Sequence, residues 1–498
     1  MRRRAFCTNA ISASVVAALP VTAKLALANA TSPVPAEVLA VSGKGEEVAL
    51  EGAAVRELRD SLDGLLLLRG DQGYELARQV WNGMVDKRPS LIVQCQNTQD
   101  VVNAVTFAAD RGLLLSVKGG GHSYPGKCVA DNGLMIDLGA MQQVTVDAAN
   151  KTATAQGGAL LGHLDSAALP HNLITTTGVV SHTGVGGFTL GGGMGRTDRV
   201  TGLAVDNVLG ATLVTADGSV RELNHENETE LFWGIRGGGG NFGITTQFEF
   251  QLHPFNPEIY GGSIFYPVSE LRTVLENWAE VNDSLPDGAS VEPQLYPISS
   301  DEQVLELQLY FTGDHAEGER VFAEFAKVGK PNGVDLGLKK YAQVQTMWDQ
   351  GTAHGQLNYI KSGLLPALTQ GAIDAIVESY QGEFLPGTWF QHLGGASARI
   401  DPQATAFPHR KVQSNYGITS TWTDPSESEV RIAKIREIYS AVQPYMKGFY
   451  TNLNEDGLTR TERNYGVNYD RLLSIKDHYD PTNLFRLNAN IVPTEKMS

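Results

Sequence analysis

Three consecutive glycines followed by a histidine form the first cluster whose residue types could do chemistry. The segment SVKGGGHSYPG spans residues 116–126 and overlaps the end of the strand-like run LLLSV. Glycines directly after a strand let backbone N–H groups surround an anion such as a phosphate. His122 would then lie just beyond the phosphates. An ordinary glycine-rich turn fits the same letters, so the motif alone leaves both interpretations open.

Two further glycine clusters lie downstream. Residues 175–195 (TTTGVVSHTGVGGFTLGGGMG) contain eight glycines. This density indicates close approach to something flat or charged, or tight packing of backbone on backbone. Residues 236–243 (RGGGGNFG) match the G-x-G-x-x-G spacing, but a strand rather than a helix follows them. They therefore fail the test for a dinucleotide-binding motif.

Alternating strands and helices must position these clusters. Strands are predicted at 91–94, 113–117, 134–138, 244–252 and 305–311, and hairpins at 143–155 and 211–223. A helix capped by Thr98 and ended by Gly112 lies between the first two strands, which predicts a β-α-β unit with parallel strands. The clearest later helix begins at Asp424. Its predicted apolar face consists of Val430, Ala433, Ile435, Ile438 and Val442.

Length and charge limit the class of protein. With 498 residues and 42% hydrophobic content, the chain can form two folded units. The formal net charge of −16 repels nucleic-acid backbones and anionic lipid, so we expect neither partner and favour a neutral or cationic small molecule. Beyond the first 30 residues only Cys95 and Cys128 remain, too few for a cysteine metal site. We expect two buried thiols and no metal.

The first 30 residues resemble an export signal. Arg3 and Arg4 precede Phe6, a moderately apolar stretch follows, and Ala28-Asn29-Ala30 resembles a cleavage site. The paired arginines favour a twin-arginine signal, with an ordinary secretory signal as the alternative. Either signal predicts an exported protein, periplasmic or secreted. No later segment approaches the ~20 apolar residues needed to span a bilayer.

Taken together, four motifs resemble one enzyme family. GGGHSYPG, the glycine-rich stretch beginning GVVSHTGVGG, ELFWGIRGGGGNFGITTQFEFQLHP and YGVNYDRLLSIKDHYDPTNLF occur in this order. Their order and spacing resemble those of the berberine-bridge-enzyme-like oxidoreductases of the vanillyl-alcohol-oxidase superfamily. The resemblance implies an α+β fold, with a two-part PCMH-type FAD-binding domain and a substrate domain whose antiparallel sheet is covered by helices. The implied parts are a signal peptide at 1–30, FAD-binding segments at 31–255 and 450–498, and a substrate domain at 256–449.

The resemblance also implies a covalently held FAD. In such proteins the histidine at the place of His122 bonds to the 8α carbon of the flavin, and the glycine loop holds the pyrophosphate. The cofactor-binding residues expected here are His122, Lys118, Gly119, Gly120, Gly121, Ser123, Gly178, Ser181, His182, Gly184, Gly187, Ile244 and Asn490.

The sequence departs from the family pattern at three positions. Val180 stands where doubly attached members have cysteine, so we expect a single covalent bond. Thr183 occupies a position that in the family helps to govern access of O₂. Leu453 replaces a tyrosine that often acts as the base or its partner. These departures leave open whether the acceptor is O₂ or another compound.

A base must take the hydroxyl proton when hydride leaves a carbon that bears OH. The candidates are Tyr450, with Asn452 beside it in sequence, and Tyr124, two residues after the flavin histidine. A free phenol titrates near ~10, so a tyrosine base needs a lowered pKa. His392 is a further candidate for the pocket.

The predicted function is oxidation of an alcohol group by hydride transfer to flavin N5. The expected substrate is a sugar, an oligosaccharide or an aromatic natural product. Two alternatives stay open: a non-catalytic flavin-binding protein of the same fold, and a flavin-dependent lyase or isomerase. The sequence does not predict the oligomeric state.

Overall fold

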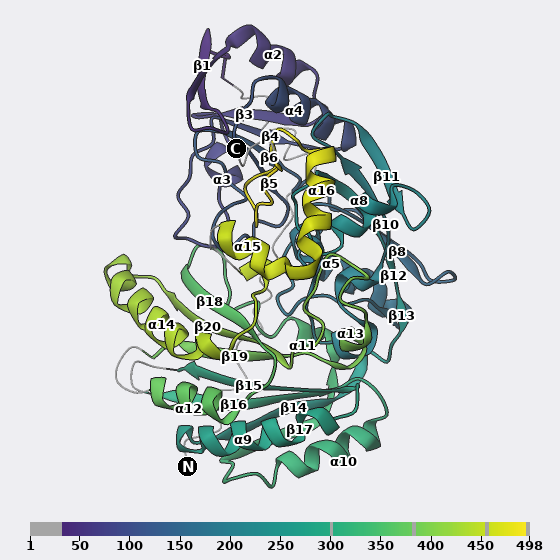
Figure 1. Cartoon of the computed structure of the whole chain (residues 1–498), viewed down its shortest axis with the longest axis vertical. Helices are drawn as coiled ribbons and strands as arrows, with labels where there is room; N and C mark the ends of the chain where they lie inside the picture. Colours follow the sequence, from purple (N-terminus) through teal and green to yellow (C-terminus); the bar gives the residue numbers. More distant parts are fainter. Residues whose placement is uncertain (1–31, 299–301, 381–384, 454–457, 495–498) are drawn as a thin grey trace.

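The computed structural model describes residues 32–298, 302–380, 385–453 and 458–494. The predicted export signal at 1–30 lies outside these residues. Mixed helices and sheets confirm the α+β class, and the molecule is elongated, with one sheet system at each end (Figure 1). Within the described residues, no helix is long and apolar enough to cross a membrane.

A four-stranded sheet near the N-terminus carries the first glycine loop. Its strands, in spatial order, are β3 (Leu65–Leu68), β4 (Leu91–Gln94), β6 (Leu134–Asp137) and β5 (Leu115–Lys118). β4 and β5 are parallel, as predicted, but β6 lies between them and pairs with both. Helix α4 (Thr98–Asp110) connects β4 and β5, and its N-cap is Asn97, whose side chain accepts from the Asp100 N–H, rather than the predicted Thr98.

Short elements surround this sheet. They are β1 (Glu37–Val41), β2 (Glu47–Glu51), α2 (Gly52–Asp60) and α3 (Tyr74–Ala77). A core that includes Leu91, Val93, Val105 and Cys95 fills the space between the sheet and α4. Cys95 and Cys128 are both free and buried, as expected.

A five-stranded antiparallel sheet carries the second and third glycine clusters. Its strands, in spatial order, are β11 (Val220–Asn224), β10 (Val208–Val214), β12 (Ile244–Gln251), β8 (Thr152–Gln156) and β7 (Val144–Asp147). Both predicted hairpins are confirmed. The associated helices and strands are α5 (Leu161–Ala168), β9 (Leu173–Ile174), α6 (Val185–Leu190), α7 (Asp198–Thr201), α8 (Thr229–Ile235) and β13 (His253–Pro254).

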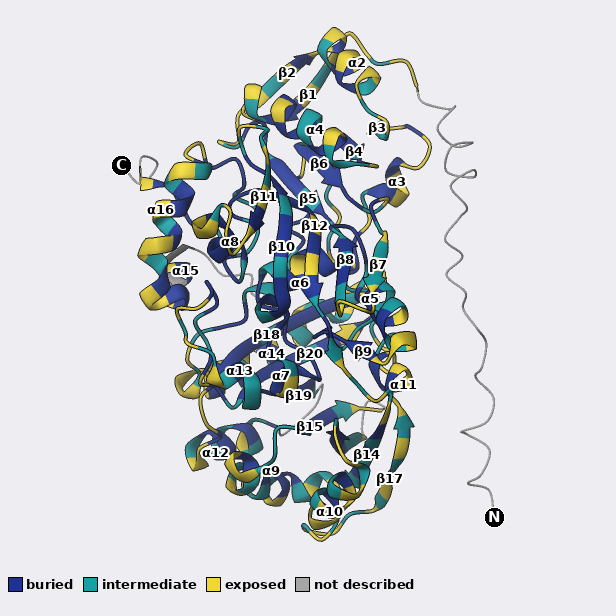
Figure 2. Cartoon of the chain, turned by 90° about the vertical axis from the view of Figure 1, so that its right-hand side faces the viewer, coloured by how far each residue is buried: buried dark blue, intermediate teal, exposed yellow. Residues whose placement is uncertain are grey.

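The opposite end of the molecule is a seven-stranded antiparallel sheet. Its strands, in spatial order, are β17 (Gly333–Lys340), β14 (Glu258–Tyr266), β16 (Gln303–Phe311), β15 (Ala289–Pro297), β19 (Gly387–His392), β20 (Ser414–Trp422) and β18 (Leu357–Leu365). Helices cover the face that points away from the rest of the molecule, namely α9 (Leu271–Val281), α10 (His315–Phe325), α12 (Gln370–Ser379) and α14 (Ser428–Val442) (Figures 1 and 2).

The helix predicted to begin at Asp424 starts as a short 3-10 turn and continues as α14. Ile435, Ile438 and Val442 are buried, as predicted, but Val430 and Ala433 are exposed. The first turns of the helix therefore extend beyond the edge of the core.

The chain returns to its starting end after α14. The helix α16 (Tyr469–Tyr479) lies beside α8, and α15 (Leu458–Tyr465) precedes it and contacts it (Figure 1). The remaining short helices are α11 (Tyr341–Gln345) and α13 (Gly395–Arg399).

Candidate active site

A cavity of about 590 Å³ lies between the two ends of the molecule. Its volume falls within the range of roughly 300–1,000 Å³ typical of cofactor and ligand sites. One side consists mainly of glycines from the three clusters, and we call Gly119–Gly121, Gly178, Gly184, Gly187 and Gly240 the glycine wall. The other side comes from β15, β18, β19 and β20, and we call it the sheet wall.

The glycine wall combines both interpretations that the sequence left open. A Cβ atom on Gly120 would lie 2.4 Å from the backbone nitrogen of Gly184, and one on Gly184 would lie 2.3 Å from that of Gly120. These two glycines therefore permit backbone-on-backbone packing. Gly187 and Gly240 have no protein atom within 4 Å of the Cβ position and line the cavity. Because no side chain occupies the space above these two glycines, a flat ligand can lie in direct contact with their backbone.

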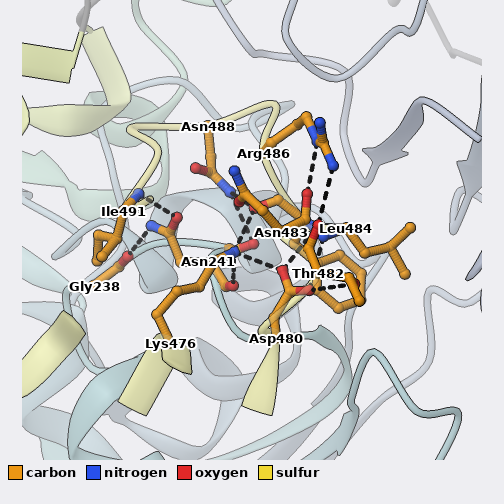
Figure 3. A network of polar contacts seen from close by, with 12 residues as sticks. Gly238, Asn241, Lys476, Asp480, Thr482, Asn483, Leu484, Arg486, Asn488 and Ile491 are labelled. Atoms are coloured by element: carbon orange, nitrogen blue, oxygen red, sulfur yellow. Dashed lines mark hydrogen bonds and ion pairs between the residues drawn. The ribbon is translucent and has the colours of Figure 1, made fainter. Parts of the chain in front are cut away.

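A buried polar network fixes the C-terminal edge of the cavity (Figure 3). Lys476 donates from Nζ to the carbonyls of Asn241 and Phe485 and to the carboxylate of Asp480, at 2.6–3.0 Å. Asp480 also accepts from the backbone N–H groups of Leu484 and Phe485. The network therefore ties the returning chain to the third glycine cluster and holds Leu487, Asn488 and Ala489 against the cavity.

His122 lines the cavity and lies within a cluster of rings. Its Nε2 is 2.6 Å from Nδ1 of His182, and its ring stacks on Trp81 with centroids 5.2 Å apart. Burial, together with the neighbouring His182 and His354, lowers the pKa of His122 well below its usual value. His122 is therefore neutral at physiological pH and has a lone pair available for bonding.

The structure brings three histidines together, a feature that the sequence analysis did not predict. One ligand atom each of His122, His182 and His354 lies within 4.8 Å of the others. The His122–His182 separation is that of a hydrogen bond between the rings, which engages both facing nitrogens. His354 lies 159 residues after Gly195, the end of the motif that contains His182, and farther still from the motif of His122, and no sequence signal connects it with either.

Most of the predicted cofactor-binding residues line the cavity. They are His122, Gly119, Gly120, Gly121, Ser123, Gly178, Gly184, Gly187 and Ile244, and the predicted catalytic residues Tyr124, Tyr450 and Asn452 join them. Val180 and Thr183 also lie in the lining.

Four predicted residues lie behind the lining rather than in it. Lys118 donates to the carbonyl of Ala77 and pairs with Asp137 at 3.2 Å, so its ammonium group is engaged beneath the loop. Ser181 is hydrogen-bonded to Asp349, and His182 to His122. Asn490 follows the lining residues 487–489, and its buried Oδ1 has no hydrogen-bond partner among the described residues.

The hydroxyl of Tyr450 is surrounded by donors. It accepts from the N–H groups of Gly193 at 3.2 Å and Met194 at 3.4 Å, and from Nδ2 of Asn452 at 2.8 Å. Burial raises the pKa of Tyr450 to about 12 in spite of these hydrogen bonds. This direction is opposite to the one that a tyrosine base requires.

The sheet wall contains the functional candidates that the sequence analysis missed. Alternate residues of β15 point to opposite sides of the sheet: Val291 enters the core under the helices, while Glu292 and Gln294 line the cavity. The other polar lining residues on this side are Asn358, Thr388, Gln391, Thr419 and Thr421. In the sequence these residues look like the polar, solvent-facing side of any strand. Only the structure shows that this side faces the cavity.

Glu292 is the only carboxylate among the described residues that line the cavity. Its Oε2 lies 3.3 Å from Nη1 of Arg196, whose guanidinium group stacks over the ring of Tyr310 at 4.7 Å. Burial raises the pKa of Glu292, while the Arg196 charge and a hydrogen bond from the His392 N–H lower it. Arg196 follows the turn at Gly193 and Met194 that binds the Tyr450 hydroxyl, so both acidic groups lie near the same turn.

His392 lies outside the lining, contrary to the expectation that it is a pocket residue. Its ring is buried between Asn282 at 2.9 Å, Arg199 at 3.1 Å and the N–H of Val291 at 3.1 Å. The residue alternates with Gln391, and on β19 it is Gln391 that points to the cavity. His392 is therefore a structural residue of the sheet.

Comparisons with known proteins agree with this geometry. The family model of the FAD binding domain matches residues 89–224, and the model described as berberine and berberine like matches residues 449–492. An FAD-linked oxidoreductase of Dictyostelium discoideum is 33% identical over 452 residues, which cover 89% of this chain and 97% of that protein. Glucooligosaccharide oxidase of Sarocladium strictum is 29% identical over 478 residues, which cover 86% of this chain and 91% of the enzyme.

A solved structure has the same fold. The crystal structure of 6-hydroxy-D-nicotine oxidase from Arthrobacter nicotinovorans superposes with a TM-score of 0.79 at 27% identity and covers 86% of this chain and 98% of its own. The fold and the glycine-lined cavity define a PCMH-type enzyme that binds FAD. The chain belongs to the berberine-bridge-enzyme-like family of FAD-linked oxidoreductases, as the resemblance of its motifs predicted.

Proposed function

We propose that the protein oxidises an alcohol group of a neutral, polyhydroxylated small molecule, using FAD bonded through His122. The observation that carries this proposal is the contrast between the two sides of one cavity. The glycine wall fits a flat cofactor, while the sheet wall presents uncharged hydrogen-bonding side chains to whatever lies against that cofactor.

FAD, when bound, supplies the acceptor for a hydride from the substrate carbon. His122 is the residue that would hold it covalently, because it is the neutral nucleophile of the lining next to the glycine loop. Ser123 and the glycine wall would contact it, and residues 487–489 would enclose its edge.

The sheet wall favours a carbohydrate-like substrate. Gln294, Gln391 and Asn358 provide amides, and Thr419 and Thr421 provide hydroxyls, which can donate to and accept from substrate hydroxyl groups. Trp348 and Trp389 add flat apolar surfaces. The one buried charge pair on this side, Arg196 with Glu292, is internally balanced and does not select a charged substrate.

Glu292 is the residue that best fits the proton acceptor. Burial raises the pKa of the Glu292 carboxyl from its ordinary acidic range in the direction of neutral pH, whereas it raises the pKa of the Tyr450 phenol further from neutral pH, to about 12. The neighbouring Arg196 charge favours the ionised carboxylate and so opposes the rise in pKa that burial causes. Tyr450, with its hydroxyl held by two backbone N–H groups and Asn452, would orient the substrate rather than accept its proton.

The direct test is anaerobic addition of neutral sugars, oligosaccharides and phenolic alcohols to the purified protein. Loss of the oxidised-flavin absorbance with a sugar, and its return on admission of O₂ or an artificial acceptor, is the expected result. A protein that keeps its oxidised flavin with the whole panel would support a non-catalytic binding protein instead. Product formation without any change in the flavin spectrum would support the lyase or isomerase alternative.

A further inference from the structure

The surroundings of His122 suggest how it becomes bonded to the cofactor. His182 touches it, with Nδ1 of His182 2.6 Å from Nε2 of His122. His182 follows Ser181, whose backbone N–H and hydroxyl both donate to the carboxylate of Asp349, at 2.8 and 2.5 Å. A loop after α11 thus brings a carboxylate to the segment that carries His182.

The hydrogen bonds of His182 fix its tautomer. Thr352 Oγ lies 3.5 Å from Nε2 and gives its own proton to the carbonyl of Trp348 at 2.8 Å. A hydrogen bond to the backbone of Asp349 also raises the pKa of His182, against the larger lowering by burial. Because the Thr352 hydroxyl donates its proton to Trp348, it accepts from His182, which places the proton of His182 on Nε2 and the lone pair on Nδ1.

The tautomer of His122 follows from that of its neighbour. Because Nδ1 of His182 is an acceptor, Nε2 of His122 must be the donor in the 2.6 Å contact. The remaining nitrogen of His122, Nδ1, therefore carries the lone pair that can bond to carbon.

We propose that His182 is a positioning residue for covalent attachment: it orients His122 and takes the Nε2 proton of His122 as Nδ1 bonds to the flavin 8α carbon. This inference rests on the proposed function, in which His122 is the attachment residue. In the balanced step, one C–H bond of the 8α methyl group breaks and one N–C bond forms. With FAD bound, two electrons would pass to the flavin ring and then, together with two protons, to O₂, which would leave as H₂O₂. One of these protons would come from the methyl group by way of solvent, and the other from Nε2 of His122 by way of His182.

The cluster is arranged to stabilise the charge that His182 acquires. The Asp349 carboxylate acts on His182 as an opposite charge and is held in place by Ser181. The ring centroid of His354 lies 5.5 Å from that of His122 and 5.0 Å from that of His182. His354 forms no hydrogen bond with either ring, so it does not fix the tautomer of either. His354 is therefore a matched control within the same cluster.

The experiment uses full-length proteins purified with their flavin. Wild type, His182→Ala, Asp349→Asn, His354→Ala and His122→Ala are compared for flavin fluorescence that stays with the denatured chain and for intact mass. For His182→Ala, which does not remove a lining residue, we expect flavin to be bound but its covalent attachment to be about 10²-fold slower or more. Added imidazole should restore the rate, since a free base can replace the missing ring.

Each result decides a separate point. Slow attachment in His182→Ala with rescue by imidazole, a smaller loss in Asp349→Asn and wild-type attachment in His354→Ala support the proposal. Wild-type attachment in His182→Ala, or slow attachment that imidazole leaves unchanged, overturns it. If His122→Ala alone loses the covalent flavin, the proposed attachment residue stands while His182 is excluded. A wild-type chain that releases all its flavin on denaturation overturns both.

Discussion

The two sides of the cavity are built by different means. The glycine wall is formed by backbone: it binds through N–H groups and by the absence of side chains, and several of its glycines also permit contact between the loops themselves. The sheet wall is formed by side chains that alternate along four strands. The comparison teaches that, under the proposed function, cofactor binding would depend on loop shape, whereas substrate choice would depend on single side chains of the sheet wall.

Loss of the carboxylate from the sheet wall is expected to have the largest effect. Replacing Glu292 by Gln keeps the shape of the side chain but removes the proton acceptor, so flavin reduction should slow about 10²–10⁴-fold. Stopped-flow absorbance under anaerobic conditions measures this rate. Gln294→Ala, two residues along the same strand, is the control and should weaken substrate binding more than it slows reduction. An unchanged reduction rate in Glu292→Gln would remove Glu292 from the chemistry.

The edge of the cavity should be sensitive to the network of Figure 3. Lys476→Met leaves the Asp480 carboxylate buried without its cation, which costs about 3–5 kcal/mol of unfolding free energy. Denaturant unfolding followed by tryptophan fluorescence measures the loss. Arg471→Met, on the same helix, breaks the exposed pair with Glu230 and should cost only about 1 kcal/mol. Equal losses in the two variants would contradict the role assigned to the buried pair.

A buried carboxylate at the junction of the two ends should make stability depend on pH. Asp165 accepts from Thr177 and from Gln345 of α11, and burial raises its pKa to about 6 from 3.8. The folded state therefore favours the protonated carboxyl group of Asp165. As the pH rises from about 4 to about 6, deprotonation should lower the free energy of unfolding by up to about 3 kcal/mol. Melting temperatures across this range should decline more steeply in wild type than in Asp165→Asn. Parallel curves would show that Asp165 does not titrate in this window.

The smallest expected effect separates binding from folding within the glycine wall. Gly187→Ala places a methyl group where no protein atom lies within 4 Å and should leave stability within about 1 kcal/mol of wild type, because alanine favours the helix α6. It should nevertheless lower flavin occupancy, measured by absorbance per chain. In Gly186→Ala the new Cβ would lie 2.8 Å from the carbonyl oxygen of Gly157, so this variant should lose stability as well. Full flavin occupancy in Gly187→Ala would show that the cofactor does not approach this position.

The sequence predicts the glycine wall well and the sheet wall poorly, for a physical reason. Backbone cradles require runs of glycine, and these leave a dense local pattern around His122 and at residues 175–195. Glu292 and Gln294 belong to a strand in which polar and apolar residues alternate, a pattern common to many strands. The polar face of such a strand is usually exposed to water. Their burial results from contact with a segment about 100 residues away, which no local pattern records.

The same limit explains the smaller errors. β6 inserts between β4 and β5, an order that depends on pairing between distant strands. His354 joins His122 and His182 only because the loop after α11 folds over them. The family resemblance of the four motifs, rather than the glycines alone, implies a cofactor role for His122, and the structure adds the two rings and the carboxylate around it.

The measurement that tests the account most directly is the fate of the flavin when the chain is denatured. Purified wild type and His122→Ala are unfolded in acid and separated by electrophoresis, and in-gel flavin fluorescence is compared with intact mass. Fluorescence and the mass of one FAD should stay with the wild-type chain and be absent from the variant. A wild-type band without fluorescence, or a fluorescent His122→Ala band, would contradict the central claim that His122 carries the cofactor.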